Sequence, residues 1–395
     1  MLRELIKRKQ LTVLGLNSGT SADGLDLAAV QLDFTKTRPK IKYFYGKTVA
    51  YPKDLSLKID AAINNRLQSI DDLVLLDRRL GVFFGEQAAR IIRLLKARNI
   101  KIDLVASHGQ TVRHLPGKFI YKGKKQSATL QLGHPESIAE ATGLVTVADF
   151  RQADIAMGGE GAPVTTGAMS LLFSNKKESR LLINIGGIAN YFLFPAGNRF
   201  DQIKARDCGP GNSLIDILTR QLFGKKYDAD GKLAARGEIS WRLLSLLLSD
   251  KFLKGQFGVS TGRERFGEKF AGKILRYAGK LHLKREDILA TVTELTAVSI
   301  AKNIGADIIH HKIENIHLFG GGWKNRYLMA RLKSNLPDVN LIAVDKLGFN
   351  PDYLEAVCYA IMGGLTIRSI ITGLPNVTGT GGRAIAGKIV QPAGR

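Results

Sequence analysis

The sequence predicts an α/β protein built from two related domains, and three observations support this class. Strand-like apolar segments alternate with helical segments in both halves of the chain. Two hairpin patterns, each with a glycine-rich turn, begin near residues 11 and 180, which indicates a duplicated unit. The chain has 395 residues with 45% hydrophobic content, which exceeds what one hydrophobic core usually supports.

The first half begins with a hairpin pattern. The apolar segments "LTVLGL" and "LDLAAVQL" flank the turn residues "NSGTSADG". A helix is expected over residues 75–98, followed by the strand "IDLVAS", which ends at Ser107. Gly143 ends the short helix "SIAEATG", and the β-branched segment "LVTVAD" is expected to be a buried strand up to Asp149.

The second half repeats this alternation. The segment "RLLINIGGIANYFLF" predicts a second hairpin with a glycine turn. It is followed by the helical segment "ILATVTELTAVSIAKNI" and by the strands "NIHLFGGG" and "LIAVD". The last long helix, "DYLEAVCYAIMGGLTIRSII", has small residues on one side, which favours close packing.

Composition excludes several classes of function. No apolar run approaches the roughly 18 residues of a membrane span, and the N-terminus lacks a secretion pattern, so we expect a cytoplasmic protein without membrane contact. Cys208 and Cys358 have no metal-ligand spacing, so no structural metal is predicted. The formal charge of +23 is spread over short basic groups without interleaved aromatics, which favours a solvated surface over a nucleic-acid site.

Glycine-rich turns predict anion binding. In "SGTSADG", backbone N–H groups and the hydroxyls of Thr20 and Ser21 can converge on a phosphate, and Asp23 can hold a phosphate-bound Mg²⁺ through water. An ordinary hairpin turn is the alternative, because turns favour the same residues. In "LFGGGWKN", three glycines separate a strand from a helix expected to begin near Lys324. Neither GxxxxGK[ST] nor an in-register GxGxxG occurs.

Six motifs in order along the chain resemble those of the anhydro-N-acetylmuramic acid kinase family, within the actin-like, sugar-kinase and heat-shock ATPase superfamily. They are "SGTSADGLD", "SHGQTVRH", "VADFRQADIAMGGEGAPV", "NIGGIAN", "DCGPGNSLID" and "FGGGWKN". The resemblance implies two actin-like (ribonuclease H-like) domains flanking a nucleotide cleft. We expect the first domain to comprise residues 1–150 plus 365–395, and the second to comprise residues 151–364.

The resemblance also implies an ATP-dependent, Mg²⁺-requiring kinase that opens a 1,6-anhydro sugar with water and phosphorylates O6. Asp207 is then the catalytic base, because the family's catalytic aspartate falls on this position. From the residues alone, Asn212 or Ser213 is expected to cap the following helix, which places Asp207 near a helix N-terminus that favours its ionised form. A purely structural role for Asp207 as a cap is the alternative.

Other site residues follow from the same motifs. Arg151 is suited to grip the lactyl carboxylate of muramic acid, and Asp149 and Asp154 are expected to position it. Glu355, an isolated carboxylate on an otherwise apolar helix, is expected to contact the sugar. The cofactor-binding residues expected for ATP are Gly19, Thr20, Ser21, Asp23, Gly24, Asp26, Gly186, Gly187, Gly320, Gly321, Gly322 and Asn325. The further sugar-binding residues expected are Ser107, His108, Gln110, Thr111 and Arg113.

The sequence departs from the family pattern at Asn17, His134 and Glu160, where the family commonly has methionine, an acidic or amide residue, and glutamine. A charged Glu160 would repel an anionic sugar, so an uncharged 1,6-anhydro sugar such as levoglucosan is the first alternative substrate. An ordinary sugar kinase that phosphorylates a free hydroxyl is a second. An actin-like ATPase module with a protein or polyanion partner, suggested by the charge, is a third. A homodimer is compatible with the family, and no nucleic-acid partner is expected.

Overall fold

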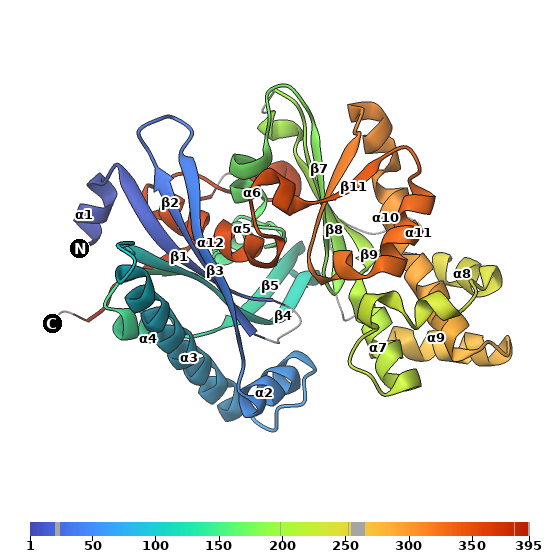
Figure 1. The fold of residues 1–395 in the computed structure, drawn as a ribbon. Helices are drawn as coiled ribbons and strands as arrows, with labels where there is room; N and C mark the ends of the chain where they lie inside the picture. Colours follow the sequence, from blue (N-terminus) through green and yellow to red (C-terminus); the bar gives the residue numbers. More distant parts are fainter. Residues whose placement is uncertain (20–23, 198, 252, 254–264, 383, 394–395) are drawn as a thin grey trace. The chain divides into compact units, whose positions relative to one another are not determined.

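A computed structural model describes residues 1–19, 24–197, 199–251, 253, 265–382 and 384–393. The chain forms two compact units, which are described separately (Figure 1). The first unit comprises Met1–Phe173 and Tyr353–Arg395, and the second comprises Ser174–Asp352. The predicted second domain comprised residues 151–364. The observed boundaries differ, because residues 151–173 and 353–364 belong to the first unit.

The first unit is built on a seven-stranded sheet with the order β12-β6-β4-β1-β2-β3, in which β5 also pairs with β4. Strands β4 and β6 run parallel to β1, whereas β2 and β3 continue the sheet as an antiparallel meander. Its strands are β1 (Gln10–Ser18), β2 (Gly24–Asp33), β3 (Lys40–Ala50), β4 (Leu104–Tyr121), β5 (Lys124–Leu132), β6 (Thr146–Ala148) and β12 (Lys388–Val390).

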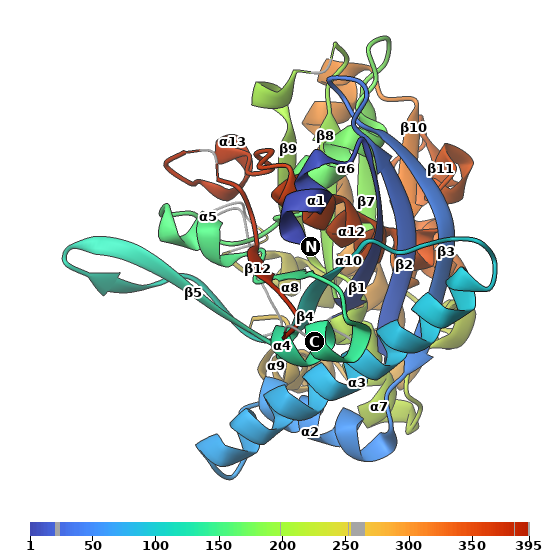
Figure 2. The same cartoon turned by 90° about the vertical axis from the view of Figure 1, so that its left-hand side faces the viewer.

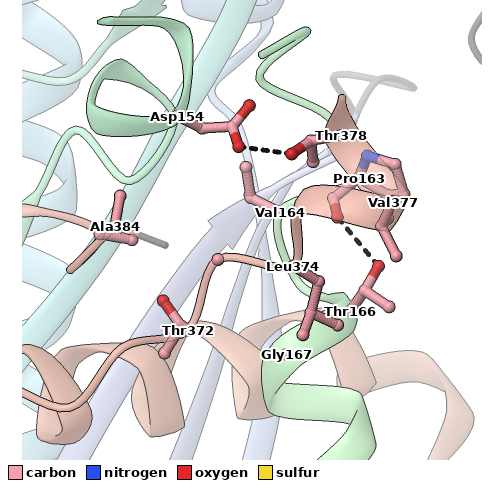
Figure 3. A pocket seen from close by; sticks show the side chains of 12 residues that line it. Asp154, Pro163, Val164, Thr166, Gly167, Thr372, Leu374, Val377, Thr378 and Ala384 are labelled. Atoms are coloured by element: carbon pink, nitrogen blue, oxygen red, sulfur yellow. Dashed lines mark hydrogen bonds between the residues drawn. The ribbon is translucent and has the colours of Figure 1, made fainter. Parts of the chain in front are cut away.

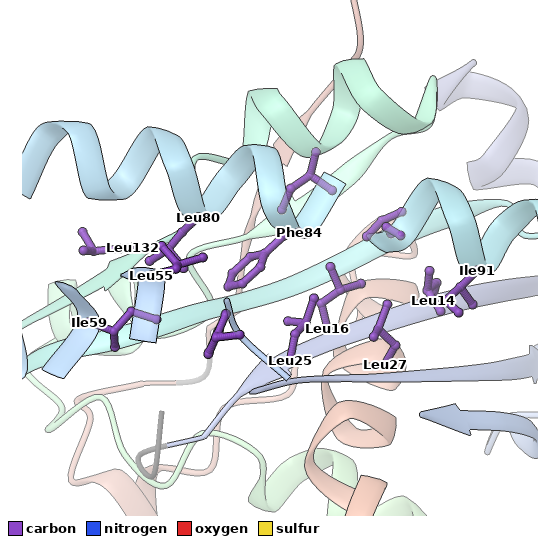
Figure 4. Close-up of a cluster of buried hydrophobic side chains, with 14 of the residues drawn as sticks. Leu14, Leu16, Leu25, Leu27, Leu55, Ile59, Leu80, Phe84, Ile91 and Leu132 are labelled. Atoms are coloured by element: carbon purple, nitrogen blue, oxygen red, sulfur yellow. The ribbon is translucent and has the colours of Figure 1, made fainter. Parts of the chain in front are cut away.

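The long helix α3 (Ile70–Lys96) covers the sheet with its apolar face, and Ser69 caps its N-terminus by accepting a hydrogen bond from the Asp72 N–H. Figure 4 shows Leu80 and Phe84 of this helix packed over the leucines of β1 and β2. The other helices of the unit are α1 (Leu2–Lys7), α2 (Lys53–Ile63), α4 (Pro135–Thr142), α5 (Gln152–Ala156), α6 (Thr166–Phe173), α12 (Leu354–Ile367) and α13 (Pro375–Thr378).

Helix α12 packs closely on β1, β2 and β4, which explains why residues 353–364 belong to the first unit. A side chain at Gly15 of β1 would lie 2.0 Å from the Ala356 carbonyl oxygen. A side chain at Gly363 would lie 2.5 Å from the Ala106 Cβ. The small residues seen in the sequence of this helix therefore let its backbone approach the sheet.

The second unit has a five-stranded sheet with the order β11-β10-β7-β8-β9. Its strands are β7 (Arg180–Ile185), β8 (Ile188–Phe194), β9 (Lys204–Pro210), β10 (Asn315–Phe319) and β11 (Asn340–Ala343). Its α-helices are α7 (Asn212–Phe223), α8 (Trp241–Leu248), α9 (Glu268–Lys280), α10 (Arg285–His311) and α11 (Arg326–Asn335). Short 3₁₀ turns include η4 (Gly321–Lys324) between β10 and α11.

The two sheets share one arrangement of strands. In each, a hairpin continues into a third antiparallel strand on one side, and two later strands add in parallel on the other, giving β6-β4-β1-β2-β3 and β11-β10-β7-β8-β9. The prediction of an α/β protein with a duplicated two-sheet architecture is confirmed.

Two expected strand boundaries are wrong. The strand expected to end at Ser107 continues to Tyr121, because residues 110–121 pair with β5 in an antiparallel ribbon. Figure 2 shows this ribbon extending beyond the rest of the first unit. The strand expected to reach Asp149 ends at Ala148, because Asp149 has a positive φ of 56°. Within the described residues no helix has both the length and the apolar composition of a membrane span.

Candidate functional site

The predicted phosphate hairpin in the first unit is formed by β1 and β2, with Asn17 paired to Asp26. Thr20, Ser21 and Asp23 lie outside the described residues. Gly19 and Gly24 flank the turn, and the Asp26 carboxylate accepts a 2.6 Å hydrogen bond from Thr48 Oγ1. The strands of the hairpin are therefore confirmed, while the roles of its tip residues stay predictions.

A buried polar network supports the base of this hairpin. The Tyr51 hydroxyl donates to Ser18 Oγ at 2.6 Å, and Ser18 Oγ in turn donates to the Gln110 side-chain oxygen. The Gln110 amide nitrogen is 3.4 Å from the Gly19 carbonyl oxygen. Gln110 is fully buried, so its side chain supports the hairpin through hydrogen bonds and presents no surface to a sugar.

The motif "SHGQTVRH" was expected in a loop, and it lies inside β4. Thr111 Oγ1 accepts a hydrogen bond from Gln131 of β5, and the Arg113 guanidinium donates to Asn65 at 3.2 Å. Ser107 is buried, and its hydroxyl has no hydrogen-bond partner among the described residues. Strand pairing therefore spreads the residues of this motif over different neighbours, because successive residues of a strand face opposite sides.

His108 and Arg151 form the closest polar pair of the predicted sugar site. Arg151 Nε donates to His108 Nε2 at 3.0 Å, and its Nη1 donates to the Gly161 carbonyl oxygen at 3.3 Å. The His108 ring stacks on Tyr359 of α12, with ring centroids 4.4 Å apart. Burial and the Arg151 charge lower the pKa of His108 well below its usual value, so His108 is a neutral acceptor.

Glu355 lies in the first turn of α12, and its side chain is the only exposed one in that helix. Its Oε2 accepts a 2.9 Å hydrogen bond from Asn17 Nδ2, which lies at the end of β1. Desolvation by the surrounding protein raises the pKa of the Glu355 carboxyl. Because the side chain is exposed, solvent screens part of this rise. The Asn17 hydrogen bond and the Arg151 charge act in the opposite direction.

Neither Asp149 nor Asp154 holds Arg151, contrary to expectation. Burial raises the pKa of Asp149, and the charges nearest to it are those of Lys388, Glu136 and Asp77. The buried Asp154 carboxylate accepts from the Gly161 N–H at 2.8 Å and from the Thr378 hydroxyl. Arg151 instead depends on His108 and on the Gly161 carbonyl, because the loop after α5 folds back around Asp154.

Figure 3 shows the bond between Asp154 and Thr378 at the edge of a small cavity in the first unit. About 20 Å³ of this cavity is accessible to a water molecule, which is room for about one water. Its apolar lining includes Val164, Leu374 and Val377. The cavity is therefore far too small to be a sugar site, and Asp154 has a structural role there.

In the second unit, three polar side chains form a row across the sheet. Asn184 of β7 is paired with Asn190 of β8, and Asn190 is paired with Asp207 of β9. Directly opposed residues of antiparallel strands face the same side of a sheet, so the side chains of Asn184, Asn190 and Asp207 lie on one face. Asn190 is between the other two. The buried Asn190 Oδ1 has no hydrogen-bond partner among the described residues.

The expected cap of the helix after Asp207 is wrong. Gly211 occupies the N-cap position of α7, and no side chain caps it. The Asn212 and Ser213 N–H groups donate to the carbonyl oxygens of Gly186 and Gly187 at 2.8 and 3.1 Å. The carbonyl groups of the β7–β8 glycine turn thus provide acceptors for the N–H groups at the start of α7. Asp207 lies on β9, the strand that leads into this helix.

The glycine triplet after β10 packs against the same hairpin. Gly320 has a φ of 79°, and a Cβ there would lie 2.3 Å from Asn184 Oδ1. A Cβ at Gly322 would lie 2.2 Å from Ile185 Cγ2. A Cβ at Gly186 or Gly321 would meet its nearest atom at 3.6 or 3.7 Å, which is an ordinary contact distance, so neither position is crowded. The triplet therefore combines two closely packed glycines with one that is not crowded.

Asn325 caps α11, because its Oδ1 accepts from the Leu328 N–H at 2.9 Å. Helix α11 begins at Arg326, close to the expected start near Lys324. The turn η4 ends at Lys324, directly before Asn325. Asn325 is buried, so the expected contact with the cofactor would have to use its remaining amide hydrogens.

Residue patterns alone gave no reason to select Asn184, Asn190 or Tyr359. The two asparagines flank the glycine turn in "NIGGIAN", and the alternation of that hairpin could have placed them on one face with Asp207. Tyr359 gave no signal, because an aromatic residue in an apolar helix is usually part of the core. The departure at His134 lies just before α4, and the His134 Nδ1 is 3.1 Å from Ser137 Oγ of that helix.

Comparison with known proteins assigns the family. The family model described as anhydro-N-acetylmuramic acid kinase matches residues 11–392. A curated protein of that name from Caldanaerobacter subterraneus subsp. tengcongensis is 36% identical over 98% of this chain and 99% of its own length. Others from Salinibacter ruber and Trichormus variabilis are 35% and 37% identical, over 99% and 96% of this chain and 99% and 97% of their own lengths.

Solved structures align more loosely. An activator of 2-hydroxyisocaproyl-CoA dehydratase from Clostridium difficile, with bound ADPNP, is 12% identical over 91% of this chain and 96% of its own, with a TM-score of 0.41. The family assignment therefore depends on sequence, and it is consistent over nearly the whole chain. The chain belongs to the anhydro-N-acetylmuramic acid kinase family.

Proposed function

We propose that this protein is an ATP-dependent kinase that opens the 1,6-anhydro bridge of anhydro-N-acetylmuramic acid with water and phosphorylates O6. The product is N-acetylmuramic acid 6-phosphate, and the reaction belongs to peptidoglycan recycling. The observation that carries this proposal is the match to the kinase family from residue 11 to residue 392, which includes the motif around Asp207.

Asp207 has the role of general base in this reaction. Its carboxylate takes a proton from the attacking water as the water oxygen bonds to the anomeric carbon. The bond between that carbon and O6 breaks, and O6 receives the γ-phosphoryl group as ADP leaves. The half-buried position of Asp207 on β9, in line with Asn184 and Asn190, is compatible with a base that water can reach.

The nucleotide is assigned to glycine turns in both units. In the second unit, the backbone at Gly186 and Gly321 is not crowded, since a Cβ at Gly321 would lie 3.7 Å from its nearest atom, Asn212 Nδ2. Such uncrowded backbone lets phosphate or ribose approach closely. The described residues contain no cluster of three or more potential metal-binding side chains. The proposal assigns Mg²⁺ to the nucleotide, because Mg²⁺ is commonly held by substrate phosphates, water and one or two carboxylates and would neutralise charge on the phosphates.

The sugar is assigned to the first unit. Arg151 supplies a fixed guanidinium for the lactyl carboxylate, and Glu355 supplies an exposed carboxylate for a sugar hydroxyl. Neutral His108 orients Arg151 and is not an acid or base. The aromatic stack of His108 on Tyr359 gives this group a rigid base.

An uncharged 1,6-anhydro sugar is the second candidate substrate, and Glu160 is the observation that favours it. Burial and the neighbouring Asp154 charge raise the pKa of the Glu160 carboxyl. When ionised, Glu160 disfavours an anionic sugar, whereas when protonated it can donate a hydrogen bond as glutamine does. The relative rates with charged and uncharged sugars distinguish these cases.

The test is ADP release with anhydro-N-acetylmuramic acid and with levoglucosan, in water enriched in ¹⁸O. We expect sugar-dependent ADP release that places ¹⁸O at the anomeric carbon and falls at least a hundredfold in Asp207→Asn. Asp201→Asn is the matched control, because Asp201 is an exposed aspartate of the same unit. If neither sugar stimulates ADP release, the kinase proposal fails. A cytoplasmic location and a homodimer stay predictions, to be tested by cell fractionation and by size-exclusion chromatography with light scattering.

A further inference from the structure

Helix α12 is buried along its whole length except at one side chain. Every residue from Leu354 to Ile367 is buried apart from Glu355, which is exposed. The helix is fixed against β1, β2 and β4, so the backbone that carries Glu355 has little freedom. The conformation of the Glu355 side chain then depends on the polar groups it contacts.

One such group is Asn17, the residue in the first hairpin that departs from the family pattern. Asn17 is only 3% exposed and is paired with Asp26 at the end of β1. Its Nδ2 donates to Glu355 Oε2 at 2.9 Å, across 338 residues of sequence. A methionine or leucine at this position would have no hydrogen to donate to the carboxylate.

Further charged and titratable groups act on Glu355. Arg151, which precedes α5, provides the nearby positive charge, and it is itself held by His108 of β4. Cys358 and Tyr359 on α12 interact electrostatically with Glu355, and burial raises the pKa of both groups to well above neutral pH. Asn17 and Arg151 therefore both favour the ionised carboxylate.

We propose that Asn17 is a positioning residue that holds Glu355 as an ionised, correctly oriented acceptor for a hydroxyl of the sugar. Asn17 acts on Glu355 alone, by fixing the orientation of the carboxylate through the hydrogen bond to Oε2. This inference rests on the proposed function for its catalytic consequence. The contact between the two side chains is independent of that function.

The competing explanation is structural. A buried amide needs a hydrogen-bond partner, and Glu355 could merely satisfy Asn17. In that case loss of Asn17 would lower stability or activity equally at every pH. A positioning role instead makes the loss depend on pH, because removing a hydrogen bond to the charged form makes protonation of Glu355 easier.

The experiment compares wild type with Asn17→Leu and Asn17→Asp. The first variant removes the donor and keeps the branched shape of the side chain, and the second places a carboxylate against Glu355. Thr12→Val is the matched control, because Thr12 is a buried polar residue of the same strand and is not a neighbour of Glu355. Two readouts are used: the dependence of kcat/KM on pH, and an infrared titration of the Glu355 carboxyl with ¹³C-labelled glutamate, assigned by Glu355→Gln.

In Asn17→Leu, we expect Glu355 to protonate at higher pH than in wild type. The acidic limb of kcat/KM should move in the same direction, with about a tenfold loss on that limb and a smaller loss at high pH. Asn17→Asp should move both further, because two adjacent carboxylates resist double ionisation. Thr12→Val should leave both curves unchanged.

An unchanged infrared titration in Asn17→Leu overturns the proposal, and so does a loss of activity that is equal at every pH. The infrared titration does not require turnover. If wild type shows no sugar-dependent ADP release, the proposed function fails while the effect of Asn17 on Glu355 is still measured. The two failures are therefore distinguishable.

Discussion

At the scale of single residues, the pair of His108 and Arg151 determines one protonation state. The guanidinium of Arg151 can only donate, so His108 Nε2 must accept and the ring proton lies on Nδ1. A protonated His108 would have no acceptor and would face a like charge. This pair gives His108, a residue of the predicted sugar site, the means to hold Arg151 in place without transferring a proton.

His108→Phe keeps a ring that can stack on Tyr359 and removes the acceptor for Arg151. We expect KM for the sugar to rise about tenfold with a smaller change in kcat, because an unrestrained Arg151 binds the substrate less well while Asp207 is unaffected. Steady-state kinetics measures this split. Exposed His310→Gln is the control, and an unchanged KM in His108→Phe would contradict the positioning role.

The same residue makes stability depend on pH. The folded-state pKa of His108 is lowered by burial and by Arg151, so below about pH 6.5 the unfolded chain binds a proton that the folded chain does not. The free energy of unfolding should therefore fall as the pH drops from 7 to 5. In His108→Phe the part of this dependence that comes from His108 should be absent, whereas His310→Gln should retain that part. Urea denaturation at both pH values measures the difference, and equal slopes in all three proteins would contradict the prediction.

At the scale of elements, two glycines with positive φ separate the effect of backbone conformation from the effect of packing. One is Gly320, in the turn after β10, and the other is Gly224. Gly320 and Gly224 both have positive φ, of 79° and 66°, but only Gly320 has atoms in the way of a side chain. Gly224→Ala should cost about 1 kcal/mol from conformation alone. Gly320→Ala should cost roughly 2–4 kcal/mol, because its Cβ would overlap Asn184 and Ile185.

Tryptophan fluorescence during urea denaturation measures this pair of variants, since both tryptophans of the chain, Trp241 and Trp323, lie in the second unit. Equal destabilisation by the two substitutions would show that the close packing of Gly320 contributes nothing. If the turn also forms part of the nucleotide site, KM for ATP should rise in Gly320→Ala and stay unchanged in Gly224→Ala.

A second element-scale prediction concerns the bond between Asp154 of α5 and Thr378 of α13, because Asp154 also accepts a hydrogen bond from Gly161 in the loop after α5. Thr378→Val removes a donor to a buried carboxylate and should cost about 2–3 kcal/mol locally. Thr378→Ser keeps the hydroxyl and should retain most of the stability. Hydrogen exchange of the amides in residues 157–162 measures the local opening, and equal exchange in the two variants would exclude a clamping role for this bond.

At the scale of the whole molecule, the net charge of +23 is the reason to test the alternative of a polyanion-dependent ATPase. We expect heparin or RNA to bind weakly, with an affinity that falls steeply with salt, and to leave ATP turnover unchanged. Anhydro-N-acetylmuramic acid should stimulate turnover at any moderate salt concentration. Stimulation of ADP release by a polyanion without any sugar would favour the ATPase alternative over the kinase.

Local patterns in the sequence were sufficient for the α/β class, for both glycine hairpins and for most helices, because period and turn chemistry are properties of neighbouring residues. Helix α10, for example, extends the predicted segment on both sides without changing its place. Family motifs added the substrate class, and the role of Asp207 as the base stays a prediction. The partners of side chains were not predictable in this way, because residues distant in sequence supply them.

Three details depend on tertiary packing for this reason. "SHGQTVRH" is a strand and not a loop because β5 is available to pair with it. Asn212 does not cap its helix because the carbonyls of Gly186 and Gly187 already accept from the helix start. Asn17 and Glu355 meet because α12 returns to the first sheet after the whole second unit. The sequence specified which chemical groups the protein carries, and long-range packing specified their partners, because a hydrogen bond depends on distance in space and not on distance along the chain.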